Sequence, residues 1–163
     1  MRGAQTAVMT LFRPITRSNL RALCALEIHP AQRDFVAPAA VTIAQQAYEP
    51  GSTILSIWQG DTPVGLMSMI HYGLPEAAPD PDSGIDRNMF YLWRLLVDRQ
   101  HQGKGHGQTA LRHFLDLARA SGQSRASLSV VDVPGSALPL YERHGFTRTG
   151  HIAQGEALLA RVL

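Results

Sequence analysis

The sequence holds little that would place the protein in a membrane or in an oxidising compartment. Its only cysteine is Cys24, so an internal disulfide framework is excluded. Its longest apolar runs are a few residues long, and the stretch from Met1 to Phe12 has no continuous apolar core of the kind found in signal peptides. We therefore expect a cytoplasmic protein that has no membrane partner.

Clustered charge and metal ligands are also scarce. Charged residues make up 17% of the chain, the net charge is +2, and the positive side chains are dispersed. Without a basic tract, the sequence does not favour a nucleic-acid partner. The seven histidines form no recognised zinc spacing, and a single cysteine cannot supply a thiolate cluster, so we expect no metal site.

What the sequence does have is a globular composition. Hydrophobic residues reach 45%, and 163 residues suit one domain that folds without disulfides or metal. The organised hydrophobic pattern begins near Leu11. We therefore expect a frayed N-terminus over residues 1–8 and a single domain over residues 9–163.

Hydrophobic periodicity predicts helices and strands in mixed order. The clearest helix has a regular apolar face from Ala110 to Ala118, and Gly122 can end it. The stretch 74–86, rich in proline, aspartate and alanine, is predicted to be an exposed loop that acts as a lid or a mobile insertion. The order indicates an α/β protein with helices packed against a mixed sheet. The other predicted helices span 17–28, 37–48 and 137–144, and the predicted strands span 11–15, 53–58, 64–70, 89–97, 126–131, 146–149 and 157–163.

A glycine-rich turn from Gln102 to Gly107 separates the strand over 89–97 from the clearest helix. Glycines let the backbone approach a ligand closely, and the free N–H groups at a helix N-terminus attract phosphates. Two phosphate-binding patterns do not fit. Gln108 stands where a P-loop requires lysine and where the dinucleotide fingerprint requires a small residue. A turn that needs its glycines only for its own geometry is the alternative.

The pattern that does fit is Gln/Arg-x-x-Gly-x-Gly/Ala, which Gln102, Gly105 and Gly107 satisfy. In these residues the sequence resembles the GNAT superfamily of acetyltransferases. The resemblance implies a mixed, mostly antiparallel twisted sheet of six to seven strands, with about four helices packed on its faces. It also implies acetyl-CoA as the cofactor, CoA as the product, and a pyrophosphate held by main-chain amides of the turn. The residues implied to bind CoA are Leu95, Leu96, Val97, Gln102, Gly103, Lys104, Gly105, His106, Gly107, Gln108 and Ser136.

A second motif, LPLYERHGF over 138–146, resembles the family's Leu/Phe-Tyr-x-x-x-Gly-Phe pattern. The resemblance places Tyr141 near the CoA sulfur, where a phenol with an ordinary pKa of about 10 can protonate a departing thiolate. A helix tyrosine that only packs is the alternative. The family's upstream asparagine is missing, and Ser136 stands in as a substitute contact. The strand before the turn resembles the family's bulged central strand, whose free main-chain groups, here at 95–97, would bind the pantetheine arm and polarise the thioester carbonyl. An ordinary core strand fits the same side chains and is the alternative.

Further stretches resemble bacterial polyamine (spermine/spermidine) N-acetyltransferases, within residues 34–50, 92–105 and 145–156. A polyamine pocket needs carboxylates because its ligand is cationic. Glu27 falls on the apolar face of the predicted helix 17–28, where it either reaches the pocket or turns to solvent. Glu27 is the candidate general base, acting through a water chain. Cys24 is expected to be a core residue. Asp34 and Glu49 are further acidic candidates. The acids of the loop (Glu76, Asp80, Asp82 and Asp86) could also suit a cationic substrate, but solvation of an exposed loop is the favoured explanation for them.

The expected activity is direct transfer of an acetyl group to a primary amine in a ternary complex. The acceptor would be a polyamine or another small amine. Alternatives are an acetyltransferase for an amino acid, a protein N-terminus or an antibiotic, and a CoA-binding regulatory module without turnover. The family resemblance is also compatible with a homodimer.

Overall fold

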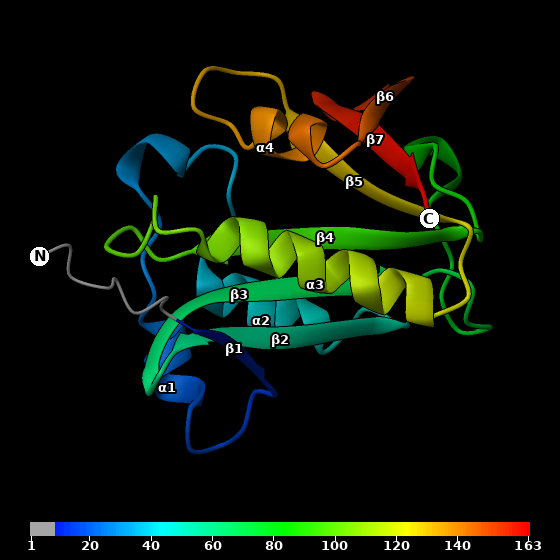
Figure 1. Ribbon diagram of the computed structural model, residues 1–163. Coiled ribbons are helices and arrows are strands. Elements are labelled where there is room, and N and C mark those ends of the chain that lie inside the picture. The colour runs from blue at the N-terminus through cyan, green and yellow to red at the C-terminus, as the bar shows by residue number, and fades with distance from the viewer. Residues whose placement is uncertain (1–8) are drawn as a thin grey trace, which may run out of the picture.

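The computed structural model describes residues 9–163, and the predicted frayed segment over residues 1–8 lies outside them. Seven strands form one sheet with helices on both faces (Figure 1). The strands are β1 (Thr10–Arg13), β2 (Ser52–Gln59), β3 (Thr62–His71), β4 (Met89–Val97), β5 (Arg125–Val131), β6 (Thr147–Ala153) and β7 (Glu156–Val162). The helices are α1 (Leu20–Cys24), α2 (Ala39–Gln46), α3 (His106–Ala120) and α4 (Leu138–Arg143), with short 3₁₀ helices η1 (Pro30–Gln32) and η2 (Pro81–Ser83).

The strand order is β1-β2-β3-β4-β5-β7-β6. Within the described residues, β4 and β5 pair in parallel and every other neighbouring pair is antiparallel. The predicted fold class, a mixed and mostly antiparallel sheet with four helices, is therefore confirmed.

Two hydrophobic layers divide the core between the faces of the sheet. On one face, Phe114 of α3 packs in a cluster with Met67 of β3. On the other face, Leu23 of α1 and Ala39 of α2 pack with Leu66 of β3. Neighbouring strand residues point to opposite faces, so adjacent residues of β3 serve different layers.

The helix α3 keeps the apolar face that the sequence predicts. Its buried side chains include Ala110, Leu111, Phe114, Leu115 and Ala118. Each buried leucine or phenylalanine contributes roughly 1.5–3 kcal/mol relative to an exposed one, which fixes the helix against the sheet. At 15 residues it is the longest described helix. No helix within residues 9–163 is both long and apolar enough to cross a bilayer.

The first helix is much shorter than predicted. The sequence predicts a helix over 17–28, but α1 ends at Cys24. Beyond it, the Glu27 N–H donates to the Asp98 carboxylate at 2.9 Å, and the Arg99 N–H donates to the Glu27 carbonyl at 2.7 Å. These bonds tie the chain to the end of β4 instead of to a further helical turn. The expectation that Cys24 is a core residue is wrong, because its side chain is exposed.

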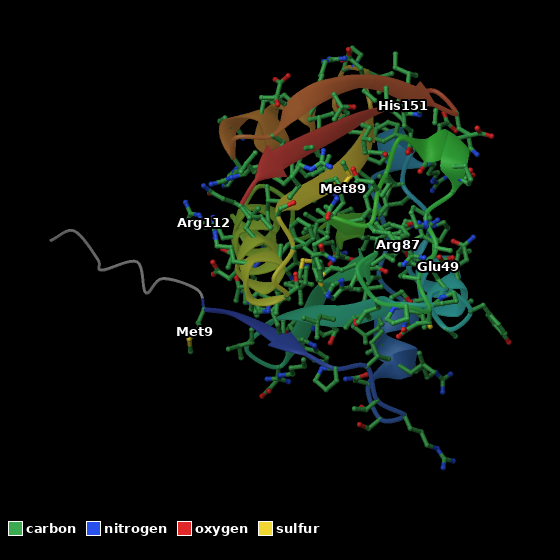
Figure 2. All side chains as sticks on the ribbon, turned by 90° about the vertical axis from the view of Figure 1, so that its right-hand side faces the viewer. Met9, Glu49, Arg87, Met89, Arg112 and His151 are labelled. Atoms are coloured by element: carbon green, nitrogen blue, oxygen red, sulfur yellow. The ribbon has the colours of Figure 1, made fainter. Side chains whose placement is uncertain are left out.

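The loop over 74–86 is predicted to be a lid or a mobile insertion. The second half of this loop is bound to the sheet. It contains η2, and the carbonyl of Asp82 lies 2.8 Å from Nε2 of His151 on β6, which Figure 2 shows beside the loop. Asp86 forms an ion pair with Arg125 at the start of β5. The loop therefore bridges β5 and β6.

Candidate active site

The strands β4 and β5 separate half-way along their length. They pair from Met89 with Arg125 to Leu92 with Leu128. At that point β4 carries a bulge, because adjacent residues of β3 pair with Arg94 and Leu92 and skip Trp93. A bulge bends a strand and strengthens its twist. The second half of β4 consequently leaves β5, and the two strands diverge (Figure 1). Residues of both strands line a cleft between them.

Main-chain groups on the second half of β4 face this cleft. The Asp98 N–H donates to the Val64 carbonyl of β3 at 2.8 Å, while the Val97 carbonyl accepts from the Gln102 side chain at 2.9 Å. The main-chain carbonyl of Val97 therefore points away from β3. Because the hydrogen-bonding direction of the main chain alternates along a strand, the main-chain N–H and carbonyl of Leu95 also point away from β3, toward the cleft.

The glycine-rich turn presents unpaired amides beside the cleft. Gly103 and Gly105 have φ of +73° and +90°, in the left-handed region that favours glycine. Gly105 is the N-cap of α3, and in the part of the chain that the structure describes no side chain caps this helix. The first turn of α3 therefore directs N–H groups without intrahelical partners, and the positive end of the helix dipole, toward this end of the cleft. Such an end binds anions.

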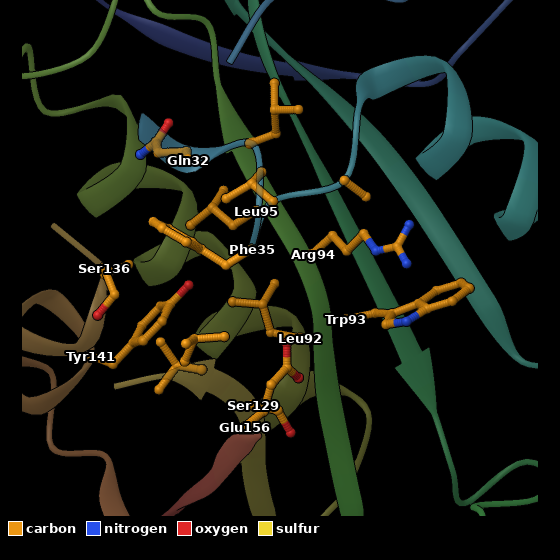
Figure 3. Close-up of a pocket in the computed structure, with 16 residues that line it drawn as sticks. Gln32, Phe35, Leu92, Trp93, Arg94, Leu95, Ser129, Ser136, Tyr141 and Glu156 are labelled. Atoms are coloured by element: carbon orange, nitrogen blue, oxygen red, sulfur yellow. The ribbon is translucent and has the colours of Figure 1, made fainter. Parts of the chain in front are cut away.

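Two adjoining cavities form one groove along the cleft. The cavity at the glycine-rich turn has a volume of about 170 Å³, and the cavity toward β7, drawn in Figure 3, has about 230 Å³. Together they make a groove from the turn to Glu156 at the start of β7. Both are bordered by Gln32, Val36, Leu95, Leu96, Ala137 and Tyr141.

Tyr141, from α4, stands where the two cavities meet, and in Figure 3 its hydroxyl points into the groove. The ring is buried and meets Phe146 edge-on, with ring centres 6.3 Å apart. Burial, followed by the nearby Tyr91 and Glu156, raises the pKa of Tyr141 to about 12. The phenol therefore keeps its proton at neutral pH and is a weaker acid than an ordinary tyrosine.

Glu156 and Arg94 bring opposite charges to the other end of the groove, and sequence reasoning identified neither as a site residue. Burial raises the pKa of Glu156 above its usual range, although the charge of Arg94 opposes this shift. A half-buried carboxylate with a raised pKa is suited to accept a proton near neutral pH. No local signal singles it out, because its place depends on β7 lying between β5 and β6.

A family model described as "Acetyltransferase (GNAT) family" matches residues 15–146, most of the chain. The chain belongs to the GNAT acetyltransferase family. Members of this family use acetyl-CoA. The glycine-rich turn of this GNAT chain fits such a ligand, because its uncapped helix start suits a pyrophosphate.

Similar proteins agree with this assignment. The rat (Rattus norvegicus) protein named N-acetyltransferase family 8 member 2 is 37% identical over 79 residues, which cover 48% of this chain and 35% of the rat protein. The GNAT chain thus matches about a third of the length of that curated relative.

Two solved structures share the GNAT fold over nearly the whole chain. An acetyltransferase from Thermus thermophilus has a TM-score of 0.72 at 20% identity and covers 96% of this chain and 99% of its own. A paia N-acetyltransferase from Thermoplasma acidophilum, solved in complex with coenzyme A, has a TM-score of 0.67 at 12% identity. The match covers 95% of this chain and 99% of the Thermoplasma chain.

Most of the CoA-binding residues that the resemblance implies border the groove. Lys104 and Gln108 do not: neither borders either cavity, and Gln108 faces a separate surface cleft with Arg112 and Arg143. The residues that do border it are Leu95, Leu96, Val97, Gln102, Gly103, Gly105, His106, Gly107 and Ser136, together with Tyr141.

Two of these side chains support the turn from the side. Gln102 donates to the Val97 carbonyl and to the Gln32 side chain, both at 2.9 Å. The His106 ring is buried between the Thr10 hydroxyl at 3.0 Å and the Gln59 side-chain carbonyl at 3.1 Å. These contacts hold the turn against β1, β2 and β4, and the main chain of His106 remains available for an anion.

Of the two places expected for Glu27, the pocket and solvent, the structure shows solvent, because Glu27 does not border the groove. Its predicted place on a helix is wrong, because α1 ends at Cys24. Its side chain is 62% exposed and pairs with Arg99 at 2.9 Å. The physical reason is the early end of α1, which turns this segment toward Arg99 and solvent. Within residues 9–163, no three His, Cys, Asp or Glu side chains gather as a metal site.

Proposed function

We propose that this GNAT chain transfers the acetyl group of acetyl-CoA to a primary amine of a small molecule, by direct attack in a ternary complex. One observation carries the proposal: a proton donor, Tyr141, and a proton acceptor, Glu156, border the same cavity (Figure 3). The cavity also borders β4 where its main chain is free on the cleft side. A group-transfer reaction between an amine and a thioester needs these three elements.

The binding half of the groove would hold the CoA part. Gly103, Gly105 and the first turn of α3 would bind the pyrophosphate through main-chain amides. The open edge of β4 at 95–97 would bind the pantetheine arm, with Ser136 on the opposite wall. Acetyl-CoA supplies an acetyl group that is activated as a thioester.

The reacting half moves two protons. An alkylamine is protonated at neutral pH, and Glu156 accepts its proton so that the nitrogen lone pair is free to attack the acyl carbon. The Leu95 N–H, facing the open side, donates to the acyl oxygen as negative charge builds there, a contribution often worth a few kcal/mol. As the C–N bond forms and the C–S bond breaks, Tyr141 gives its phenolic proton to the sulfur, and the second proton that the nitrogen loses as the amide forms replaces it on the phenol.

The class of amine is a separate matter, and the polyamine acceptor stays a prediction. The acidic residues named for it from the sequence, Asp34, Glu49 and the acids of the loop over 74–86, border neither cavity. The carboxylate that does border the groove is Glu156. One carboxylate can serve one amine, whereas a polyamine carries several ammonium groups.

Two measurements test the proposal. Calorimetric titration with CoA checks the binding half, and thiol release from acetyl-CoA with a panel of spermidine, amino acids, a peptide N-terminus and aminoglycosides checks turnover. We expect CoA binding together with amine-dependent thiol release. CoA binding without release on the whole panel would indicate a regulatory CoA-binding module, and no binding of CoA would contradict both readings.

A further inference from the structure

Arg94 carries an unpaired charge at the end of the groove where Glu156 lies, which we call the acceptor end. Within residues 9–163 it forms no ion pair, and its single side-chain hydrogen bond is a long one, 3.4 Å, to the Thr42 hydroxyl of α2. The side chain is half-buried, and burial lowers its pKa against the opposing effect of Glu156 and Tyr91. A charge removed from water without a partner costs stability. An unpaired guanidinium beside a cavity therefore points to an anionic ligand.

Neighbouring side chains hold this guanidinium in place. It lies over the Trp93 ring, 5.0 Å from the ring centre, and Figure 3 shows both side chains leaving β4 on the same side. Thr42 approaches it from α2. A guanidinium that lies over an aromatic ring can still bind a carboxylate along its edge through two parallel hydrogen bonds.

Building on the function proposed above, we propose that the acceptor is a free α-amino acid. Its carboxylate pairs with Arg94 while Glu156 takes the proton of its amine. An α-amino acid carries both charges on one carbon, and the acceptor end of the groove offers one positive and one negative side chain that border the same cavity.

Other acceptor classes fit these charges less well. A polyamine would bring a second ammonium group toward an unpaired guanidinium, and like charges repel. A peptide N-terminus has a neutral amide where a free amino acid has its carboxylate, so it would leave Arg94 unpaired.

The experiment uses matched acceptors that differ only at the carboxylate. Phenylalanine, phenylalaninamide and phenethylamine form one set, and lysine, lysinamide and cadaverine form a second. We expect kcat/KM to be higher for the amino acid than for its amide or its decarboxylated amine by about ten- to hundredfold, the usual range for a hydrogen-bonded charge. Equal or faster turnover of the amide or the amine would overturn the inference.

Arg94→Gln is expected to bring the ratio within each set close to one, and Arg94→Lys to restore part of it. Arg13→Gln is the matched control, because Arg13 also lies over a tryptophan, Trp58, at 4.7 Å but borders neither cavity. This control should keep the wild-type ratio. A ratio within a set does not depend on the fraction of folded enzyme, so a loss of stability cannot imitate the result. A wild-type ratio retained in Arg94→Gln would overturn the role of Arg94.

Direct binding separates this inference from the proposed function. Calorimetry with the CoA-loaded protein should show phenylalanine binding at least tenfold more tightly than phenethylamine. Turnover without a preference for the carboxylate contradicts the amino-acid acceptor alone. Tight amino-acid binding without turnover supports the acceptor class and contradicts the transfer reaction.

Discussion

The two ends of the groove are built in different ways. At the end beside the glycine-rich turn, the turn end, Leu95 to Gly107 are close in sequence, and what they offer a ligand is mainly main-chain N–H groups. At the acceptor end, Arg94 comes from β4, Glu156 from β7 and Phe35 from the segment before α2, and Glu156 and Arg94 present ionisable side chains. One end is a local motif, and the other exists only in the folded sheet.

This difference predicts different responses to mutation. Main-chain donors are neutral at all accessible pH values and keep their place through backbone geometry, so damage to them should appear as weaker CoA binding. Ionisable side chains act through proton transfer, so damage to them should appear in turnover and in its dependence on pH. Four substitutions test this contrast.

Glu156→Gln should have the largest effect. We expect kcat/KM to fall by about 100-fold or more, because the amine loses its proton acceptor. In the wild type, kcat/KM should decline toward acid with a midpoint above the ordinary glutamate pKa of about 4.3, since burial raises the pKa of Glu156. The variant should lack this decline, and pH–rate profiles measure both effects.

The same substitution should stabilise the protein. A glutamate whose folded pKa is raised keeps full stability below its unfolded pKa and loses stability as pH rises toward its folded pKa. Glu156→Gln should therefore unfold at higher urea concentration than the wild type at pH 7, and the gap should close below about pH 4. Glu142→Gln, at an exposed site on α4, is the control. An equal gain in stability against urea in this variant would contradict the assignment of the effect to the buried carboxylate of Glu156.

Tyr141→Phe should lower kcat by about 100-fold while the Kd for acetyl-CoA changes little, because only the proton donor is lost. Steady-state kinetics and calorimetry separate the two quantities. Tyr48→Phe, at a ring that is 89% exposed, is the matched control. Equal losses of kcat and of affinity in Tyr141→Phe would mean that the ring only packs.

Gly105→Ala should weaken CoA binding by about tenfold with a smaller effect on kcat. A Cβ at φ of +90° costs roughly 1–2 kcal/mol, and relaxation of that strain moves the amides of the turn. Gly122→Ala is the control, because it has φ of +79° and equally open surroundings just beyond the other end of α3. Both variants should lose similar stability in urea. Unchanged CoA affinity in Gly105→Ala would argue against the turn as the pyrophosphate site.

His106→Gln should have the smallest effect and should act on stability. Burial, with His101 and Lys104 nearby, lowers the pKa of His106, so the unfolded chain takes up a proton first as pH falls below about 6.5. Wild-type stability should therefore decline toward acid in this range, and the variant should decline less. Urea unfolding between pH 5 and pH 8 measures the difference. Parallel curves for both proteins would contradict the assignment to this ring.

Much of the turn end of the groove and of the sheet could be predicted from the sequence. The strand predicted over 89–97 has the same bounds as β4, because a run rich in aromatic and branched residues has few alternatives to a central strand. The apolar face of α3 could also be predicted, because the spacing of its apolar residues repeats with the period of a single helix. The prediction for 17–28 was wrong, because the hydrogen bonds of Glu27 to the segment after β4 compete with a second helical turn.

The sequence by itself determined the order of helices and strands, the left-handed glycines before α3 and the family, because these depend on patterns within a few residues. Only the tertiary structure decided that Glu27 is exposed and that Glu156 and Arg94 border one cavity. Glu156 and Arg94 reach this cavity because β7 lies between β5 and β6 and because β4 bulges at Trp93. Pairing between distant strands places these charges, and no local pattern specifies which distant residues will face each other.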